Sequence, residues 1–281
     1  MTTLVPDARR GLLGGLIDDA NLIGPGKPSV EQAVAAYRAR RAGPTGWMVG
    51  RFVAPTSCLE ELASVLVRTM AQGEAPWSIV AVLDGQQETG TSIAASFHTT
   101  MNPAASVDVV HVVAHDAAAA AAAAAGIHHG ALPMTSAATA ADEHSRHSSV
   151  GIVINVDVLP AMDLASSIAT CARDSVPFTL SAAILPGHTI VGANSGTHRF
   201  GAVNLLASSL SAATGRETAI EAALSDADPA GYSIGFGGLM RGGRPIRAGR
   251  ALDTDRTPLV SIATSEPDEA LAALGLLESS H

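Results

Sequence analysis

The sequence predicts an α/β protein whose fold is a (β/α)8 TIM-type barrel with an N-terminal helical extension. Short apolar runs rich in Val and Ile alternate with longer segments of helical periodicity, which is typical of parallel sheets covered by helices. Eight such runs follow residue 46, which is the number that closes a barrel of this type. The length of 281 residues suits one domain of that architecture.

The eight predicted strands are bounded by turn or cap residues, and each precedes a segment that can form a helix. They are Val49–Ala54, Ser78–Leu83, Val107–Ala114, Ala131–Ser136, Val150–Val156, Phe178–Ile184, Tyr232–Phe236 and Leu259–Ala263. We predict that residues 1–46, with helical patterns at Asp7–Ala20 and Ser29–Ala42, pack on the barrel, and that residues 47–281 form the barrel as a single domain. The alternative is an open doubly wound sheet, whose first strand usually runs into a glycine-rich turn that Ala54–Ser57 does not provide.

Capping patterns mark the starts of several predicted helices. Ser57 with Glu60 has the spacing of a capping box, in which a hydroxyl and a carboxylate bond to the free N–H groups of the first turn, and Thr218 with Glu221 repeats the pattern. The nine alanines of Ala117–Ala125 predict one further helix of high propensity. Its methyl surface would allow close approach of another element or of a second subunit, and the alternative is a helix that only fills space.

Composition excludes some classes of function. Apolar residues make up 47% of the chain and charged residues 15%, so an apolar surface covered in a homo-oligomer is one interpretation and a surface of small residues is the other. A net charge of −9 without a basic cluster argues against nucleic-acid binding. No run approaches the roughly 20 apolar residues of a membrane span, no signal peptide is evident, and Cys58 and Cys171 fit no metal or redox spacing. We therefore expect a cytoplasmic protein that binds a small molecule.

Candidate catalytic residues follow from the rule that barrel enzymes place their chemistry at the carboxyl ends of the strands. Carboxylate, imidazole and guanidinium groups near these ends can form an acid–base set or a site for a divalent metal. The alternative for each aspartate is a helix N-cap. The candidates are Arg51, Asp84, His115 and Asp157 on or after strands, and His188 and His198 in the long loop Leu185–Arg199.

A phosphate site is a further candidate at the last two predicted strand ends. In barrels, phosphate often binds at these loops through backbone N–H groups and a helix N-terminus. Gly237, Gly238 and Ser265 are the candidate residues, and a glycine-rich turn without a ligand is the alternative.

The sequence argues against several cofactors and catalytic motifs. The only lysine is Lys27, far from the predicted strand ends, so a Schiff-base or pyridoxal phosphate enzyme is not expected. The sequence contains no H-E-x-x-H, G-x-S-x-G or P-loop motif. A divalent metal is the cofactor that the candidate residues still allow.

Several segments resemble an uncharacterised bacterial protein family. They are Ile17–Ala20, Gly43–Pro55, Pro177-Phe178 with His198–Asn204, and Ser265–Leu277. The resemblance covers about a third of the chain and implies no known activity. The chain departs from that family at Thr179, where the family has a lysine, and in Ile152–Val158, which lacks the family's basic pair.

Two functions follow from these observations. The first is an enzyme of lyase or isomerase type acting on a small anionic metabolite, with Arg51 and Arg199 orienting the anion and the aspartates and histidines supplying acid–base or metal-binding groups. The second is a non-catalytic barrel that acts in assembly or regulation, which the near absence of lysine, the low charge and the predicted alanine helix favour. The sequence does not decide whether the chain is an enzyme.

Overall fold

A computed structural model describes residues 8–24, 26–84, 87–101, 107–113, 130–133, 150–191, 198–212, 217–228, 231–235, 238–246 and 258–276. The helices are α1 (Ala8–Leu13), α2 (Val30–Ala42), α3 (Leu59–Thr69), α4 (Gln87–Met101), α7 (Ala161–Arg173), α8 (Ala202–Ala212), α9 (Glu217–Ser225) and α10 (Pro267–Leu276), with short 3-10 turns at Gly46–Met48 and Thr56–Cys58. The strands are β1 (Ile17–Asp19), β2 (Val49–Pro55), β3 (Trp77–Val82), β4 (Val107–Val113), β5 (Gly130–Pro133), β6 (Val150–Asn155), β7 (Phe178–Ala182), β8 (Ile190–Val191), β9 (His198–Arg199), β10 (Tyr232–Gly235), β11 (Gly238–Arg241), β12 (Arg244–Pro245) and β13 (Leu259–Thr264).

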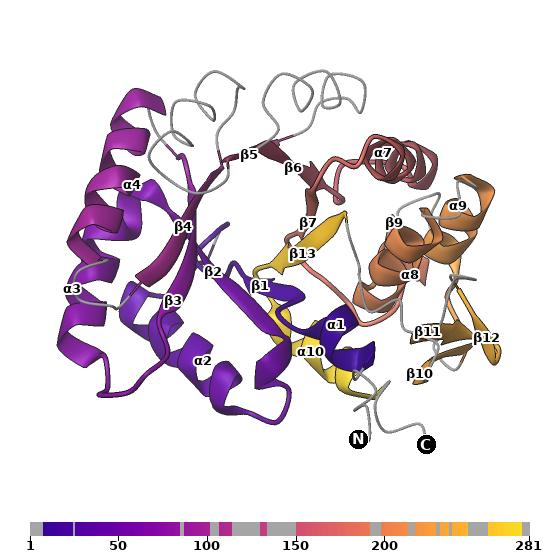
Figure 1. Ribbon diagram of the computed structural model, residues 1–281, viewed down its shortest axis with the longest axis horizontal. Coiled ribbons are helices and arrows are strands. Elements are labelled where there is room, and N and C mark those ends of the chain that lie inside the picture. Colours follow the sequence, from indigo (N-terminus) through magenta and orange to yellow (C-terminus); the bar gives the residue numbers. More distant parts are fainter. Residues whose placement is uncertain are drawn as a thin grey trace, which may run out of the picture.

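One parallel sheet organises the fold (Figure 1). Its strand order is β1-β13-β7-β6-β5-β4-β3-β2, and β1 also pairs with β2, so the order closes on itself. Two small antiparallel sheets, β8-β9 and β10-β11-β12, lie outside this sheet. No described helix is both long and apolar enough to cross a bilayer.

The fold predicted from the sequence, a (β/α)8 TIM-type barrel with an N-terminal helical extension, is not the fold observed. Six consecutive strands, β2 to β7, form a curled parallel sheet, and the two strands that connect its edges differ from the prediction. One of them, β1, is three residues long and lies within Asp7–Ala20, which we expected to be helical. The predicted seventh barrel strand, Tyr232–Phe236, instead contributes β10 to the antiparallel sheet with β11 and β12.

The physical reasons for this difference are local. A three-residue strand is too short to show any periodicity, so β1 merges with the helical pattern before it. The β-propensity of Tyr232–Gly235 does not distinguish a parallel strand from an antiparallel one, and Gly238, with φ +93°, allows the tight return that pairs β10 with β11. The chain is therefore an α/β protein with a curled parallel sheet and two separate small antiparallel sheets. The predicted alanine helix lies outside the described residues.

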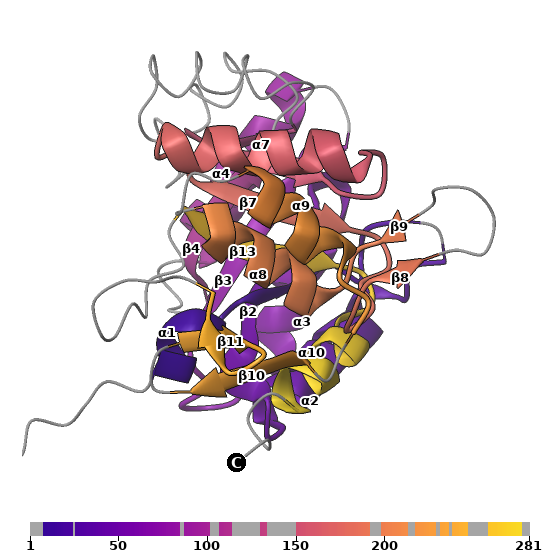
Figure 2. The ribbon, with the colours of Figure 1, turned by 90° about the vertical axis from the view of Figure 1, so that its right-hand side faces the viewer.

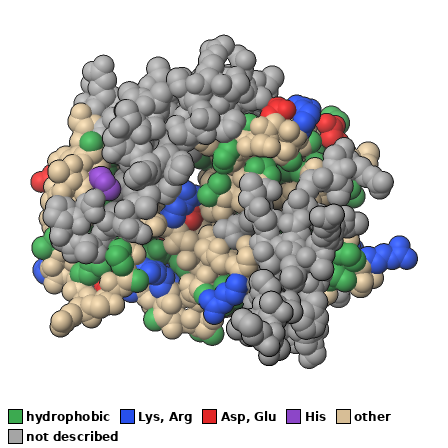
Figure 3. Space-filling view, in the orientation of Figure 1, with side chains coloured by type: hydrophobic (Ala, Val, Ile, Leu, Met, Phe, Trp, Pro, Cys, Tyr) green, Lys and Arg blue, Asp and Glu red, His purple; other side chains and the backbone are tan. Residues whose placement is uncertain are grey.

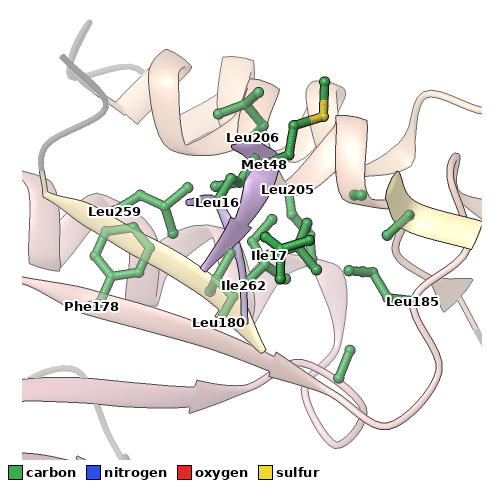
Figure 4. Packing of buried hydrophobic residues seen from close by; sticks show 14 of the residues in the cluster. Leu16, Ile17, Met48, Phe178, Leu180, Leu185, Leu205, Leu206, Leu259 and Ile262 are labelled. Carbon is green, nitrogen blue, oxygen red and sulfur yellow. The ribbon is translucent and has the colours of Figure 1, made fainter. Parts of the chain in front are cut away.

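The convex face of the sheet carries the main hydrophobic core. Figure 2 shows α7, α8 and α9 stacked over β7 and β13, with the β8-β9 hairpin extending to one side. All eleven residues of α8 are buried, because this helix packs against α7, α9 and α10 as well as the sheet. Figure 4 shows Leu205 and Leu206 of α8 in the same hydrophobic cluster as Ile17 of β1 and Ile262 of β13.

Three aromatic rings join α2 to the sheet. Tyr37 of α2 lies 5.1 Å from Phe52 of β2 and 4.6 Å from Trp77 of β3, measured between ring centroids. All three rings are buried, and the Tyr37 hydroxyl donates a hydrogen bond of 2.7 Å to the carbonyl of Gly50. The predicted helix Ser29–Ala42 is confirmed as α2, and Ser29 caps it through a capping box with Gln32.

The concave face carries polar as well as apolar side chains. A small apolar cluster of Ala20, Val53, Val80 and Ala263 is separate from the main core and lies on the inner side of β2, β3 and β13. Polar side chains lie two residues earlier on the same strands, at Arg51 and Ser261. The inner face therefore combines an apolar layer with a polar one.

Close contact between β1 and β2 requires glycine at position 50. A Cβ added there would lie 2.5 Å from Asp18 Oδ1 and 2.6 Å from the carbonyl oxygen of Gly15. Gly50→Ala should therefore separate the two strands and destabilise the fold by about 2 kcal/mol or more, as overpacking does in a close-packed interior. Urea unfolding monitored by Trp fluorescence measures this loss.

Gly275→Ala is the matched control for that substitution. Its nearest neighbour would be the Thr45 methyl at 3.1 Å, which can turn away, and alanine favours the helical backbone of α10. We expect unchanged or slightly higher stability. Equal losses for the two variants would contradict the role of Gly50.

Candidate functional site

A buried ion pair lies on the concave face of the curled sheet. Arg51 of β2 donates to Asp18 of β1 through its backbone N (2.7 Å to Oδ1), its Nε (2.9 Å to Oδ2) and its Nη2 (2.5 Å to Oδ2). The Asp18 side chain is 1% exposed and the Arg51 side chain 18%. The carboxylate therefore fixes one edge of the guanidinium group.

Two hydroxyls extend this pair across the next two strands. Ser261 of β13 donates to Asp18 Oδ2 at 2.6 Å and also lies 2.6 Å from Arg51 Nη2. Thr179 of β7 lies 3.3 Å from both Arg51 Nη2 and the Ser261 hydroxyl. The result is a polar network that crosses four neighbouring strands, β2, β1, β13 and β7.

Strand alternation explains why two adjacent aspartates have different roles. Successive side chains of a strand point to opposite faces, so Asp18 lies inside the curl and Asp19 on the helical side. Asp19 is fully buried and pairs at 2.7 Å with Arg40 of α2, which also holds Asp268 of α10 at 2.7 Å. Burial raises the pKa of Asp19 above its ordinary value, and the charge of Arg40 opposes that rise.

The remaining edge of the Arg51 guanidinium has no partner in the part of the chain that the structure describes. Nη1 makes no hydrogen bond to any residue that the structure describes, whereas Nε and Nη2 are both occupied. Half-buried residues with small side chains, Gly151 and Ser181, lie on the inner sides of β6 and β7. Figure 3 shows a hollow near the middle of one face of the molecule with a basic and an acidic side chain beside it.

Asp84 is used as a helix cap. It follows β3 and accepts hydrogen bonds from the Thr56 hydroxyl (2.7 Å), the Ser57 backbone N (3.0 Å) and the Ser57 hydroxyl. Burial raises the pKa of Asp84, but the hydrogen bonds from Ser57 and Thr56 outweigh it and the pKa lies below its ordinary value. The predicted capping box of Ser57 with Glu60 is wrong, since the partner of Ser57 is Asp84 and α3 begins at Leu59.

Asp157 and Ser265 meet on the segment that follows β7. Asp157 Oδ2 accepts the backbone N–H of Ala183 at 2.7 Å, and the Ser265 hydroxyl donates to the Ala183 carbonyl. Asp157 is exposed, and its Oδ1 makes no hydrogen bond to any described residue. The two residues thus tie the carboxyl ends of β6 and β13 to that of β7.

His188 lies at a different part of the molecule, near the end of α9. Its half-buried ring has a buried Nδ1 for which no described residue provides a hydrogen-bond partner. Burial lowers the pKa of His188 below its ordinary value, and the charges of Asp226 and Asp228 oppose that shift. A Cβ on Gly201 would lie 2.3 Å from the His188 backbone, so only glycine permits this contact.

A buried amide and a buried hydroxyl anchor the segment around His188. Asn204 of α8 is fully buried, accepts from the Thr189 N–H at 2.9 Å and donates to the carbonyls of Ala223 (2.9 Å) and Asp226 (2.6 Å). The Thr189 hydroxyl donates to the Leu224 carbonyl at 2.8 Å. This loop is therefore held firmly where it meets α8 and α9.

None of the remaining candidate residues that the structure describes joins this network. His115 and Gly237 lie outside the described residues, as does the side chain of His198, whose backbone forms β9. Gly238 pairs with Gly235 in the β10-β11 hairpin, whereas Ser265 lies after β13. Within the described ranges, no group of three or more His, Cys, Asp or Glu side chains is arranged to hold a metal ion.

Sequence reasoning missed three members of the polar network: Asp18, Thr179 and Ser261. Asp18 was available as an acidic residue that directly follows a short apolar run, but a strand of three residues gives no pattern that would place it beside Arg51. Comparison of the chain with protein-family models, curated proteins and solved structures finds no match.

The two single substitutions that break the Asp18–Arg51 ion pair should destabilise the protein to different extents in a double-mutant cycle. Arg51→Gln leaves a fully buried carboxylate without its counter-charge and should lower the free energy of unfolding by about 3–5 kcal/mol. Asp18→Asn leaves a partly exposed guanidinium and should cost less, about 1–3 kcal/mol. The double variant should lose at least 1 kcal/mol less than the sum, as coupled neighbours do. Urea unfolding of the four proteins gives the coupling, and additive losses would contradict a direct pair.

His188 predicts a dependence of stability on pH. Because burial lowers its pKa in the folded protein, the unfolded chain takes up a proton more readily. Its contribution to stability should decline as pH falls from about 6.5 through the lowered pKa and then level off. The free energy of unfolding of the wild type minus that of His188→Gln should therefore be smaller at pH 5 than at pH 8. If this difference is the same at pH 5 and pH 8, burial does not favour the neutral form of His188 in the folded protein.

Proposed function

We propose that the chain binds a small anionic metabolite on the concave face of the curled sheet, with Arg51 as the group that holds the anion. One observation carries this proposal. The guanidinium is fixed along one edge by Asp18, while its Nη1 has no hydrogen bond among the described residues. An arginine held in this way offers two N–H donors in a defined direction, as binding sites for carboxylates and phosphates require.

Preorganisation supports a role in binding. A flexible arginine loses rotamer freedom when it binds a ligand, and this loss weakens binding. Arg51 has already lost that freedom, because Asp18 and Ser261 hold its side chain. The Asp18–Arg51 pair also joins β1 to β2, so its presence alone fits a purely structural role; the lack of a partner for Nη1 among the described residues favours the functional one.

A lyase or isomerase reaction on the bound anion is the second candidate. The observation in its favour is Asp157, whose exposed carboxylate is held through Oδ2, while Oδ1 has no partner among the described residues and is available for proton transfer. The non-catalytic alternative is favoured by the structural bonds of Arg51, Asp84 and Asp157. Loss of turnover in Asp157→Asn with unchanged ligand binding would separate catalysis from binding.

A cytoplasmic location and a homo-oligomer belong to the same proposal. Cys58 and Cys171 are both unpaired, as expected in a reducing compartment. Val158 and Met162 are 71% and 67% exposed near the start of α7, and apolar side chains of this kind are often covered by a second subunit. Sedimentation velocity measures the oligomeric state.

A ligand screen tests the binding proposal. Small carboxylates and phosphates at millimolar concentration should raise the melting temperature of the wild type, since a ligand that binds only the folded state stabilises it. The variant Asp18→Asn/Arg51→Gln, which removes both charges, should show no such shift. The matched control is Glu31→Gln/Arg68→Gln, which removes an exposed ion pair between α2 and α3 and should respond like the wild type. Equal shifts in all three proteins would place the anion elsewhere.

A further inference from the structure

We infer that the ligand of Arg51 is a short aliphatic monocarboxylate rather than a phosphate or a dicarboxylate. This inference rests on the proposed function and specifies the charge and the chemical class of the ligand. Three features of the concave face carry it: the charge balance of the ion pair, the number of free donors and the neighbouring apolar layer.

The charge balance favours a monoanion. Asp18 compensates the single positive charge of Arg51, and no other Lys or Arg among the described residues donates to this network. A ligand at Nη1 therefore meets one guanidinium with a carboxylate directly behind it. Each additional negative charge on the ligand is repelled by Asp18 without gaining a new partner.

The donors available match one carboxylate group. Nη2 is already shared among Asp18, Ser261 and Thr179, and the two hydroxyls are bonded within the network. Phosphate sites usually add backbone N–H groups at a helix N-terminus. Arg51 and Ser261 lie in the third positions of β2 and β13, whereas the helices begin only after these strands end. The two N–H groups of Nη1 thus remain as donors, which suits one carboxylate.

The apolar layer on the same face provides a surface for a short hydrocarbon chain. Val53 follows Arg51 by two residues on β2, and Ala263 follows Ser261 by two residues on β13, so each pair shares a face. Val80 and Ala20 complete this layer. A carboxylate bound at Arg51 would place its aliphatic part beside these methyl groups, where its burial is favourable.

Calorimetry with four matched ligands tests the inference on the wild-type protein. Butyrate is the monoanion, succinate and inorganic phosphate carry more charge, and butyramide is the neutral isostere of butyrate. We expect butyrate to bind at least about tenfold more tightly than each of the other three. Tighter binding of succinate or phosphate would overturn the inference and leave the proposed function intact. Binding of none of the four would overturn both.

Asp18→Asn tests the electrostatic cause directly. Removal of the counter-charge leaves a net positive site, so the affinity for succinate relative to butyrate should rise about tenfold. Asp268→Asn is the matched control, since it removes one negative charge from an exposed residue on the convex side and should leave that ratio unchanged. An unchanged ratio in Asp18→Asn would refute the inference.

A second measurement on the wild type covers the case in which Asp18→Asn does not fold. Binding of a monoanion to a compensated pair should depend little on salt, so a tenfold rise in ionic strength should change the Kd for butyrate by less than about threefold. A steeper dependence would indicate an uncompensated positive site and would overturn the inference.

Discussion

The bond between Asp18 and Arg51 is the interaction on which the curled sheet depends. β1 is three residues long, and so short a strand gains little from its backbone ladder with β13 and β2. The Asp18 carboxylate adds bonds to β2 and β13, while Asp19 on the opposite face reaches α2 through Arg40. Two adjacent aspartates thus fasten β1 to the sheet on one side and to the helical layer on the other, and without them the sheet would keep two open edges.

The same bond connects architecture with function. A buried charge pair of this kind contributes little net stability compared with well-packed apolar residues. Its presence at the centre of the concave face is easier to understand if the guanidinium also has a ligand to hold. Nη1 of Arg51 has no hydrogen-bond partner among the described residues, whereas Nε and Nη2 and the hydroxyls of Thr179 and Ser261 are bonded within the network. Stability and binding would then share one arginine, which would restrict substitutions at position 51 more severely than either role alone.

Sequence patterns predicted the strands that appear as continuous apolar runs. They missed features that depend on contacts between residues far apart in the sequence. The runs at Val49–Ala54, Ser78–Leu83 and Phe178–Ile184 correspond to β2, β3 and β7, because buried parallel strands are continuous apolar runs. β1 was missed because its length hides it, and β10 was assigned to the wrong sheet because propensity does not encode the partner strand. Arg51 was identified as an anion contact from its residue type and its strand. Its partner Asp18 could not be found, since no local pattern pairs residues from two strands 33 positions apart.

The hydrogen bond from Ser261 to Asp18 spans 243 residues of sequence. During synthesis, β1 can meet β2 early, because the chain between them is short. Its other neighbour, β13, leaves the ribosome only after all the intervening strands. The nascent protein must therefore carry an incomplete ring through most of its translation, with one side of β1 unpaired. Folding dominated by so distant a contact is slow, and the exposed edge makes this interval the one in which a chaperone would be most useful.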